Sequence, residues 1–296
     1  MKKRTEGCTF GAWLGRIAER LIPVPLLGIV LIILCAAESA ARQPHVSAPL
    51  DPARYLRFQG TTSYAEIPNS PDFSVSTSGL TVAVWMRPDA LTFPQTEGSL
   101  PTEQYVHWLG KGEPSREEWT FRMYSQTTPP GPRANRVSFY VFNPEGKRGC
   151  GSYFQDPLVV GQWVHVVGVV DTMAQQTAIY KNGQLRHSDS YSGQVTPAQG
   201  AVPLRLGTKD LASFFEGAIG SVRIWNRPLS LIEIQKLYAA NVVPRHGLVA
   251  QYKLTEGSGP VIHDTADGHD GTLLNAVWAR GRGPIGVATG SSGGGC

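Results

Sequence analysis

The sequence has no long run of like charge. Charged residues make up only 17% of its 296 residues, the net charge is +4, and no five consecutive residues are basic. Binding to a nucleic-acid backbone requires clustered lysine and arginine side chains. The composition therefore predicts no nucleic-acid partner.

Cysteine is also scarce. Two of the four cysteines, Cys8 and Cys35, lie near the N-terminus, and Cys150 and Cys296 are the other two. Two cysteines define neither a disulfide framework nor a zinc-binding spacing. Cys150 and Cys296 either pair with each other outside the cytosol or stay separate thiols.

The first 41 residues have the composition of a secretory signal. Basic residues come first, an apolar run covers 21–37, and small residues follow it. This order predicts cleavage after Ser39 or Ala41, and a secreted, periplasmic or cell-surface protein. Two alternatives stay open: an uncleaved membrane anchor, because the run is close to the length that spans a bilayer, and a lipoprotein processed at Cys35. The membrane would be contacted only through this segment.

The rest of the chain has the pattern of short β-strands. Apolar and polar residues alternate in segments rich in β-branched and aromatic side chains, such as 80–86, 119–124, 137–142 and 162–170. Asn182 and Gly183 are a signal for a tight hairpin turn. The predicted fold class is all-β, a sandwich of two antiparallel sheets. It would cover 54–280, between a linker at 42–53 and a disordered Gly/Ser-rich tail at 281–296.

One short surface helix is predicted near 229–239. Ser230 and Glu233 have the spacing of a capping box, and apolar residues follow at helical intervals. Beyond the helix, 248–280 contains further strand patterns. This segment either completes the sandwich or is the stub of a second domain.

Motifs along the chain resemble a known family when they are taken in order. They are 56–60, 64–71, 80–88, 161–166, 180–183 and 217–230. Together they resemble the laminin-G-like domains of the concanavalin A-like lectin/glucanase superfamily, of the type found in bacterial exported proteins. The resemblance implies a jelly roll that binds a glycan or, alternatively, an envelope protein.

The carboxylate motif of the related glucanases is missing. Those enzymes carry Glu-x-Asp-x-x-Glu on one strand, so that the acids lie on one face beside the scissile bond, and this spacing does not occur here. His165 has the character of a packed strand residue, and His107, His263 and His269 show no metal-binding spacing. We therefore predict no catalytic residues, with a displaced hydrolase or lyase site as the alternative.

A glycan site would need aromatic side chains that stack on sugar rings, with polar groups beside them. The segments 88–110, 125–135 and 143–156 look irregular, and loops on a rigid sandwich are where binding usually resides. The predicted ligand-binding residues are Tyr105, Trp108, Arg133, Arg136 and Tyr153. The alternative for each aromatic residue is that it covers the edge of the core.

Calcium is the cofactor that the resemblance implies, because family members hold it with loop carboxylates and carbonyls. The predicted metal ligands are Asp264, Asp267 and Asp270, within one Gly/Asp-rich loop. An ordinary polar turn is the alternative, since Asp and Gly both favour turns. Gln59 stands where the family often has Asp, and this departure weakens the calcium assignment.

Overall fold

The computed structural model describes residues 53–114, 116–127, 130–143, 145, 148–191 and 199–284. The predicted leader, linker residues 42–52, the tail from 285 onward and Cys296 lie outside these ranges, so pairing of Cys150 with Cys296 stays a prediction. The chain divides into Met1–Gln43 and Pro44–Cys296, and the described residues all belong to the second unit. In that part of the chain, no helix has the length and apolar character needed to cross a membrane.

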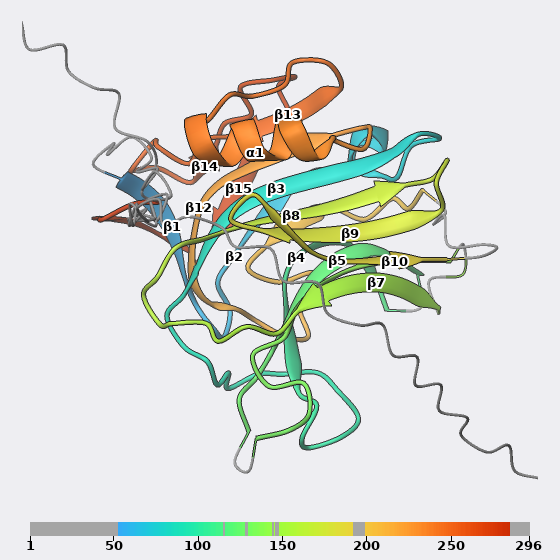
Figure 1. Cartoon of the computed structure of the whole chain (residues 1–296). Coiled ribbons are helices and arrows are strands. Elements are labelled where there is room, and N and C mark those ends of the chain that lie inside the picture. Colours follow the sequence, from blue (N-terminus) through green and yellow to red (C-terminus); the bar gives the residue numbers. More distant parts are fainter. Residues whose placement is uncertain are drawn as a thin grey trace, which may run out of the picture. The chain divides into compact units, whose positions relative to one another are not determined.

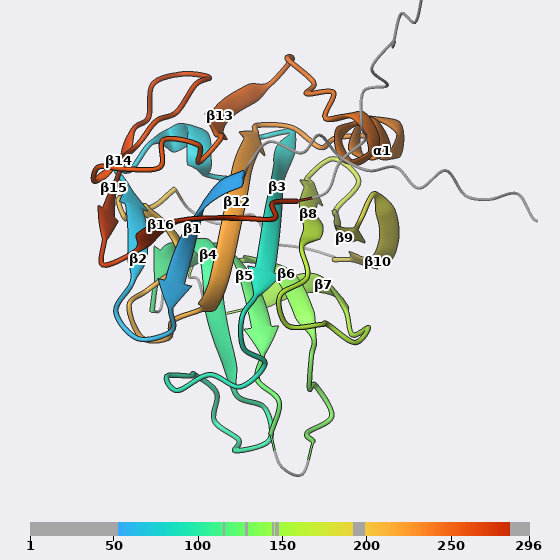
Figure 2. The same ribbon diagram turned by 90° about the vertical axis from the view of Figure 1, so that its left-hand side faces the viewer.

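Two antiparallel sheets form the domain (Figures 1 and 2), which confirms the predicted all-β sandwich. Sheet I contains, in spatial order, β10 (Gln184–Ser190), β9 (Gln176–Lys181), β8 (Val164–Asp171), β3 (Gly79–Pro88), β12 (Glu216–Trp225), β1 (Ala53–Gln59) and β16 (Val277–Gly281), with β13 (Leu248–Tyr252) also paired to β12. Sheet II contains β14 (Val261–Ile262), β15 (Gly271–Leu274), β2 (Tyr64–Ile67), β11 (Leu204–Leu206), β4 (Tyr105–Glu113), β5 (Arg116–Tyr124), β6 (Val137–Phe142) and β7 (Gly149–Phe154). The helical elements are η1 (Pro71–Phe73) and α1 (Leu231–Ala240).

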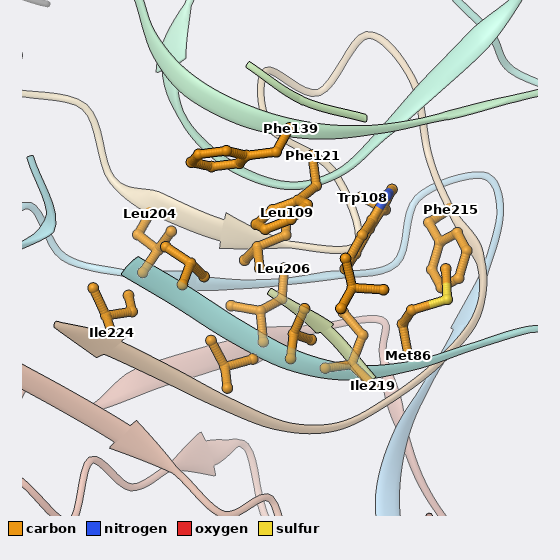
Figure 3. Close-up of a cluster of buried hydrophobic side chains, with 14 of the residues drawn as sticks. Met86, Trp108, Leu109, Phe121, Phe139, Leu204, Leu206, Phe215, Ile219 and Ile224 are labelled. Atoms are coloured by element: carbon orange, nitrogen blue, oxygen red, sulfur yellow. The ribbon is translucent and has the colours of Figure 1, made fainter. Parts of the chain in front are cut away.

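The hydrophobic core lies between the two sheets. Because successive side chains of a strand point to opposite faces, alternate residues of each strand enter this layer. Figure 3 shows Phe121 and Phe139 of sheet II above Ile219 and Met86 of sheet I, with Trp108 beside them. All five side chains are fully buried. The opposite faces of both sheets are therefore the surfaces left for other contacts.

The C-terminal strands complete both sheets. β13 pairs with β12, β15 pairs with β2, and β16 pairs with β1. These pairings satisfy strand edges that would otherwise present unpaired backbone groups. Residues 248–281 thus belong to the sandwich, and Gly281, predicted as the first residue of the tail, is the last residue of β16.

Helix α1 covers part of the outer face of sheet I (Figure 1). It begins after Ser230, whose Oγ accepts from the Glu233 backbone while the Glu233 side chain accepts from the Ser230 backbone, so the predicted helix and capping box are confirmed. Ile234 and Leu237 pack in one cluster with Trp225. No α-helix of the described chain covers the outer face of sheet II.

Candidate functional site

Arginine and tyrosine side chains form a continuous layer on the outer face of sheet II. Arg122 of β5 lies opposite Ser138 of β6, which lies opposite Tyr153 of β7, and directly opposed residues share a face. Tyr124 shares that face by alternation and lies opposite Tyr105 of β4. We call this layer the Arg–Tyr face. It consists of Tyr105, Arg122, Tyr124, Arg133, Arg136, Tyr140 and Tyr153.

Stacking between guanidinium groups and aromatic rings holds the layer together. The Arg122 guanidinium lies 4.6 Å from the ring centre of Tyr105 and 4.9 Å from that of Tyr140. The Arg136 guanidinium lies 4.0 Å from the ring centre of Tyr153. At these separations a cation is attracted to the π-electrons of the ring. The rings and the guanidinium planes are therefore oriented before any ligand arrives.

Several polar groups of the Arg–Tyr face remain available to a ligand. Arg136 donates twice to Oε1 of Gln155, at 3.1 and 3.0 Å, but pairs with no carboxylate of the described residues. The hydroxyl groups of Tyr105, Tyr140 and Tyr153 form no hydrogen bond within those residues either. Such a surface can stack on a ligand ring and also form hydrogen bonds to its substituents.

A set of buried and half-buried polar side chains lies beside Tyr105 on the same face. We call it the buried polar cluster, and it consists of Glu97, His107, Glu117, Arg122, Lys209, Asp210 and Ser213. Glu97 precedes β4 and is held there by a backbone bridge to Tyr105. Three members come from the connection between β11 and β12, and the Ser213 hydroxyl accepts from the His107 backbone at 3.0 Å.

Ion pairs organise the cluster. Lys209 is fully buried, and its Nζ lies 2.9 Å from Oε1 of Glu117 and 3.1 Å from Oδ2 of Asp210. His107 is also fully buried, and its Nε2 lies 3.6 Å from Oε1 of Glu97. Burial, with the charges of Lys209 and Arg122, holds the pKa of His107 well below its usual value of 6.5, so the imidazole is neutral. Burial, with the Asp210 charge, raises the pKa of Glu97.

The cluster leaves buried polar atoms without hydrogen-bond partners. They are His107 Nε2, Glu117 Oε2, Arg122 Nε, Lys209 Nζ and Asp210 Oδ2. The two contacts of Lys209 are short ion pairs that lack the alignment of hydrogen bonds. Because buried polar groups are normally satisfied, these atoms gathered at one place are able to bind an ion or a ligand.

A second buried lysine shows the contrast. Lys111 pairs with Glu118 and also donates to Ser74 Oγ at 3.1 Å and to the Gly200 carbonyl at 3.0 Å. Glu118 accepts from Ser74 at 2.7 Å and from the Gly200 backbone at 2.9 Å. This pair is satisfied by the protein alone, as expected of a structural ion pair.

A family model described as the concanavalin A-like lectin/glucanases superfamily, of the laminin-G type, matches residues 59–235. The chain belongs to this superfamily. The match ends within α1, so the strands β13 to β16 lie beyond it. A search of curated proteins finds no significant match.

Solved structures are similar to this chain. A Bacteroides ovatus ATCC 8483 protein assigned to carbohydrate binding is similar with a TM-score of 0.59 and 17% identity, over 81% of this chain and 63% of that one. The chain thus spans less than two thirds of that protein. A heptameric SAP-like pentraxin from Limulus polyphemus has a TM-score of 0.48 and 13% identity, over 81% and 98%. The CBM40 of Ruminococcus gnavus IT-sialidase, bound to α2,3-sialyllactose, has a TM-score of 0.46 and 13% identity, over 65% of this chain and 99% of that one.

Four of the five predicted ligand-binding residues of this lectin-like domain lie on the Arg–Tyr face, and Trp108 does not. Trp108 is fully buried in the core, with ring centres 4.9 Å from Phe121 and 6.1 Å from Phe215 (Figure 3). The expectation that Trp108 contacts a ligand is wrong. The predicted irregular segment 88–110 includes the first part of strand β4, and within that strand Trp108 points to the opposite face from Tyr105.

The predicted calcium ligands lie in a loop that its own carboxylates organise. Asp264 accepts backbone hydrogen bonds from Gln251 at 2.7 Å, Ala266 at 2.9 Å and His269 at 3.1 Å. Asp270 accepts from the Asp264 backbone and contacts His263 Nδ1. These bonds fit a self-satisfied turn better than a shared ion site. Calcium here stays a prediction.

Asp267 is grouped differently from the prediction. Together with Asp72 and His269 it forms one of two sets of potential metal ligands in the described residues, the other being Glu97, His107 and Asp210. The sequence indicated neither set, because their members come from separate segments without metal-binding spacing. His107 was rejected for that reason, and only the pairing of β4 with its neighbours brings it to Glu97 and Asp210.

Proposed function

We propose that this domain binds a glycan through the Arg–Tyr face, as an exported, non-catalytic module of the cell envelope. The observation that carries the proposal is the layer of stacked arginine and tyrosine side chains with unpaired hydroxyl groups. The signal-like composition of the first 41 residues supports export. The similar Bacteroides ovatus protein assigned to carbohydrate binding supports the ligand class.

The chemistry of the face suits a sugar ring. The apolar side of a pyranose can stack on Tyr153 or Tyr140, while its hydroxyl groups contact the tyrosine hydroxyls and Arg136. Because the stacked arginines already hold the rings, little side-chain entropy is lost when the ligand binds. Arg136 has no carboxylate partner within the described residues, so we expect a uronate-bearing glycan to bind more tightly than a neutral one.

Glycoside hydrolysis is the second candidate, because Glu97 has a raised pKa and lies near Asp210. Oxygen atoms of these two carboxylates lie within 4.8 Å of each other. Glycosidases place their acids about 5–10 Å apart on opposite sides of the bond. The Asp210 side chain is only 1% exposed and is paired with Lys209. It cannot flank a substrate, so binding remains the better explanation.

A glycan array tests the proposal. The full chain is applied to neutral and uronate-bearing oligosaccharides, and the affinity for the best ligand is measured by calorimetry. We expect Tyr153→Ala and Arg136→Gln each to weaken binding about 5- to 150-fold, since a stacking or charge-assisted contact is worth about 1–3 kcal/mol. The matched control is Arg57→Gln on sheet I, whose side chain is 55% exposed and pairs with Asp89.

The outcomes separate the candidate functions. If Arg57→Gln also abolishes glycan binding, the binding site lies elsewhere on the domain. No retained glycan, together with capture of one envelope protein that sugars do not displace, would favour the protein-binding alternative. Release of reducing ends from a bound polysaccharide, lost in Glu97→Gln, would establish the hydrolase instead.

A further inference from the structure

We propose that Glu97, His107 and Asp210 bind a divalent transition-metal ion of the zinc type. One ligand atom from each residue lies within 4.8 Å of the others. The inference goes beyond glycan binding and does not depend on it, because the three residues lie beside the Arg–Tyr face and not within it. An imidazole with two carboxylates is a donor set that zinc prefers, whereas calcium takes six to eight oxygen atoms.

The hydrogen bonds of His107 leave one nitrogen available as a ligand. Its Nδ1 lies 2.7 Å from Oγ1 of Thr120, and that hydroxyl lies 3.3 Å from the carbonyl of Leu109. The Thr120 hydroxyl has a carbonyl acceptor within reach, so in the metal-bound state His107 Nδ1 can carry the ring proton and donate it to Oγ1. In that tautomer Nε2 offers its lone pair toward Glu97. The side chain is fully buried, and its Nε2 atom has no hydrogen-bond partner. Metal-binding histidines are oriented by this kind of bond from the other nitrogen.

The separation between donor atoms fits a shared ion. Nε2 of His107 and Oε1 of Glu97 lie 3.6 Å apart, too far for a hydrogen bond. A tetrahedral zinc ion with ligand bonds of about 2.0–2.2 Å holds neighbouring donors about 3.4 Å apart. The two side chains would need to move by only a few tenths of an ångström. An ion between them would also pair atoms that are now orphaned.

The surrounding charges can accept such an ion. The cluster contains three carboxylates and the two cations Lys209 and Arg122, so its carboxylates outnumber its cations by one. Ser213 donates to Glu97 Oε1 at 2.6 Å, which orients that carboxylate as a second-layer partner. A divalent ion would leave one net positive charge, and this favours water, hydroxide or an anionic ligand at the remaining coordination position.

The second set of potential ligands provides a matched control. In the set of Asp72, Asp267 and His269, the side chains of Asp72 and His269 are 43% and 21% exposed, whereas that of His107 is fully buried. Asp267 is exposed. This set therefore lacks a fully buried imidazole nitrogen without a hydrogen-bond partner, which is the feature that distinguishes His107. We expect no tight metal site there.

Metal titration of the full chain tests the proposal. The protein is treated with a chelator, freed of it, and titrated with Zn²⁺ by calorimetry and with Co²⁺ by visible absorption. We expect a site that takes up one ion, and at least about a hundredfold weaker binding in Glu97→Gln, His107→Asn and Asp210→Asn, because even second-layer changes cost about 10–100-fold. His107→Asn keeps a donor toward Thr120 and removes only the ligand nitrogen. Asp267→Asn should bind as the wild type does.

Further measurements keep the test decisive if a variant folds poorly. Thr120→Val leaves the three ligands in place and should weaken metal binding about tenfold or more, because the imidazole loses its orienting partner. Zn²⁺ should raise the melting temperature of the wild type, and the Co²⁺ spectrum should lack thiolate charge-transfer bands. The proposal is overturned if the wild type binds no ion, if thiolate bands appear, or if only Asp267→Asn abolishes binding.

Discussion

Replacement of His165 by phenylalanine should make the stability of the domain less sensitive to acid. His165 lies on β8 with its ring centre 5.0 Å from that of Trp85 and 5.8 Å from that of Tyr238. Burial, with the charge of Arg223, lowers its pKa from 6.5 to about 3. Its Nδ1 has no hydrogen-bond partner. The buried ring is therefore neutral, as its packed position in the sequence predicted.

The sign of the effect follows from proton uptake. Below about pH 6.5 the unfolded chain protonates this imidazole, whereas the folded chain does not until about pH 3. The unfolded state binds more protons in this window, so the free energy of unfolding falls as the pH falls, by about 1.4 kcal/mol per pH unit. Between pH 6 and pH 4 the contribution of His165 amounts to about 3 kcal/mol.

The assay is urea unfolding followed by tryptophan fluorescence at pH 7, 6, 5 and 4. Phenylalanine keeps an aromatic ring between Trp85 and Tyr238 and removes the titrating, unpartnered nitrogen. We expect the slope of unfolding free energy against pH to fall by about 1.4 kcal/mol per unit in His165→Phe. The control is His246→Gln in an exposed loop, which should keep the wild-type slope. Equal slopes for His165→Phe and the wild type would refute the reasoning.

Three further substitutions test the core, the loop and the structural ion pair, each by urea unfolding. Trp108→Ala should lower the unfolding free energy by about 3–5 kcal/mol, because the ring fills the core, and should leave the glycan affinity of the folded protein unchanged. Lost affinity at unchanged stability would show that Trp108 contacts the ligand. Asp264→Asn should lower the unfolding free energy by about 1–3 kcal/mol, equally with calcium or with chelator, since it removes acceptors for backbone N–H groups. A decrease seen only with calcium would show a calcium site. Lys111→Met should cost about 3–5 kcal/mol because Glu118 is left buried without its cation, and a neutral result would contradict the assigned ion pair.

The alternation of apolar and polar residues along the strands made the fold predictable. It predicted only part of the Arg–Tyr face. The alternation in 119–124 and 137–142 predicted strands β5 and β6, and the capping box at Ser230 predicted α1. The same alternation would have placed Trp108 in the core, but the turn-rich composition of 88–110 hid the strand that contains it. Side-chain direction depends on where a strand begins, and that boundary is the weakest part of a sequence-based prediction.

The buried polar cluster was beyond prediction for a different reason. Glu97, His107 and Asp210 are more than a hundred positions apart at their extremes and share no motif. They meet because two separate segments lie beside β4, which contains His107. A backbone bridge joins Glu97 to Tyr105, and the pairing of β11 with β4 brings the following connection, with Asp210, to the same place. Only the pairing of strands across the whole chain creates that proximity, so no local signal records it.

Oxidative footprinting with bound oligosaccharide tests the central claim most directly, because it reports which aromatic side chains a ligand covers. The account predicts that the ligand protects Tyr105, Tyr140 and Tyr153 from oxidation. Trp163, which directly precedes β8, and Tyr238 of α1 should stay as reactive as in the free protein. Protection of Trp163 or Tyr238, with the three tyrosines of sheet II unchanged, would contradict it.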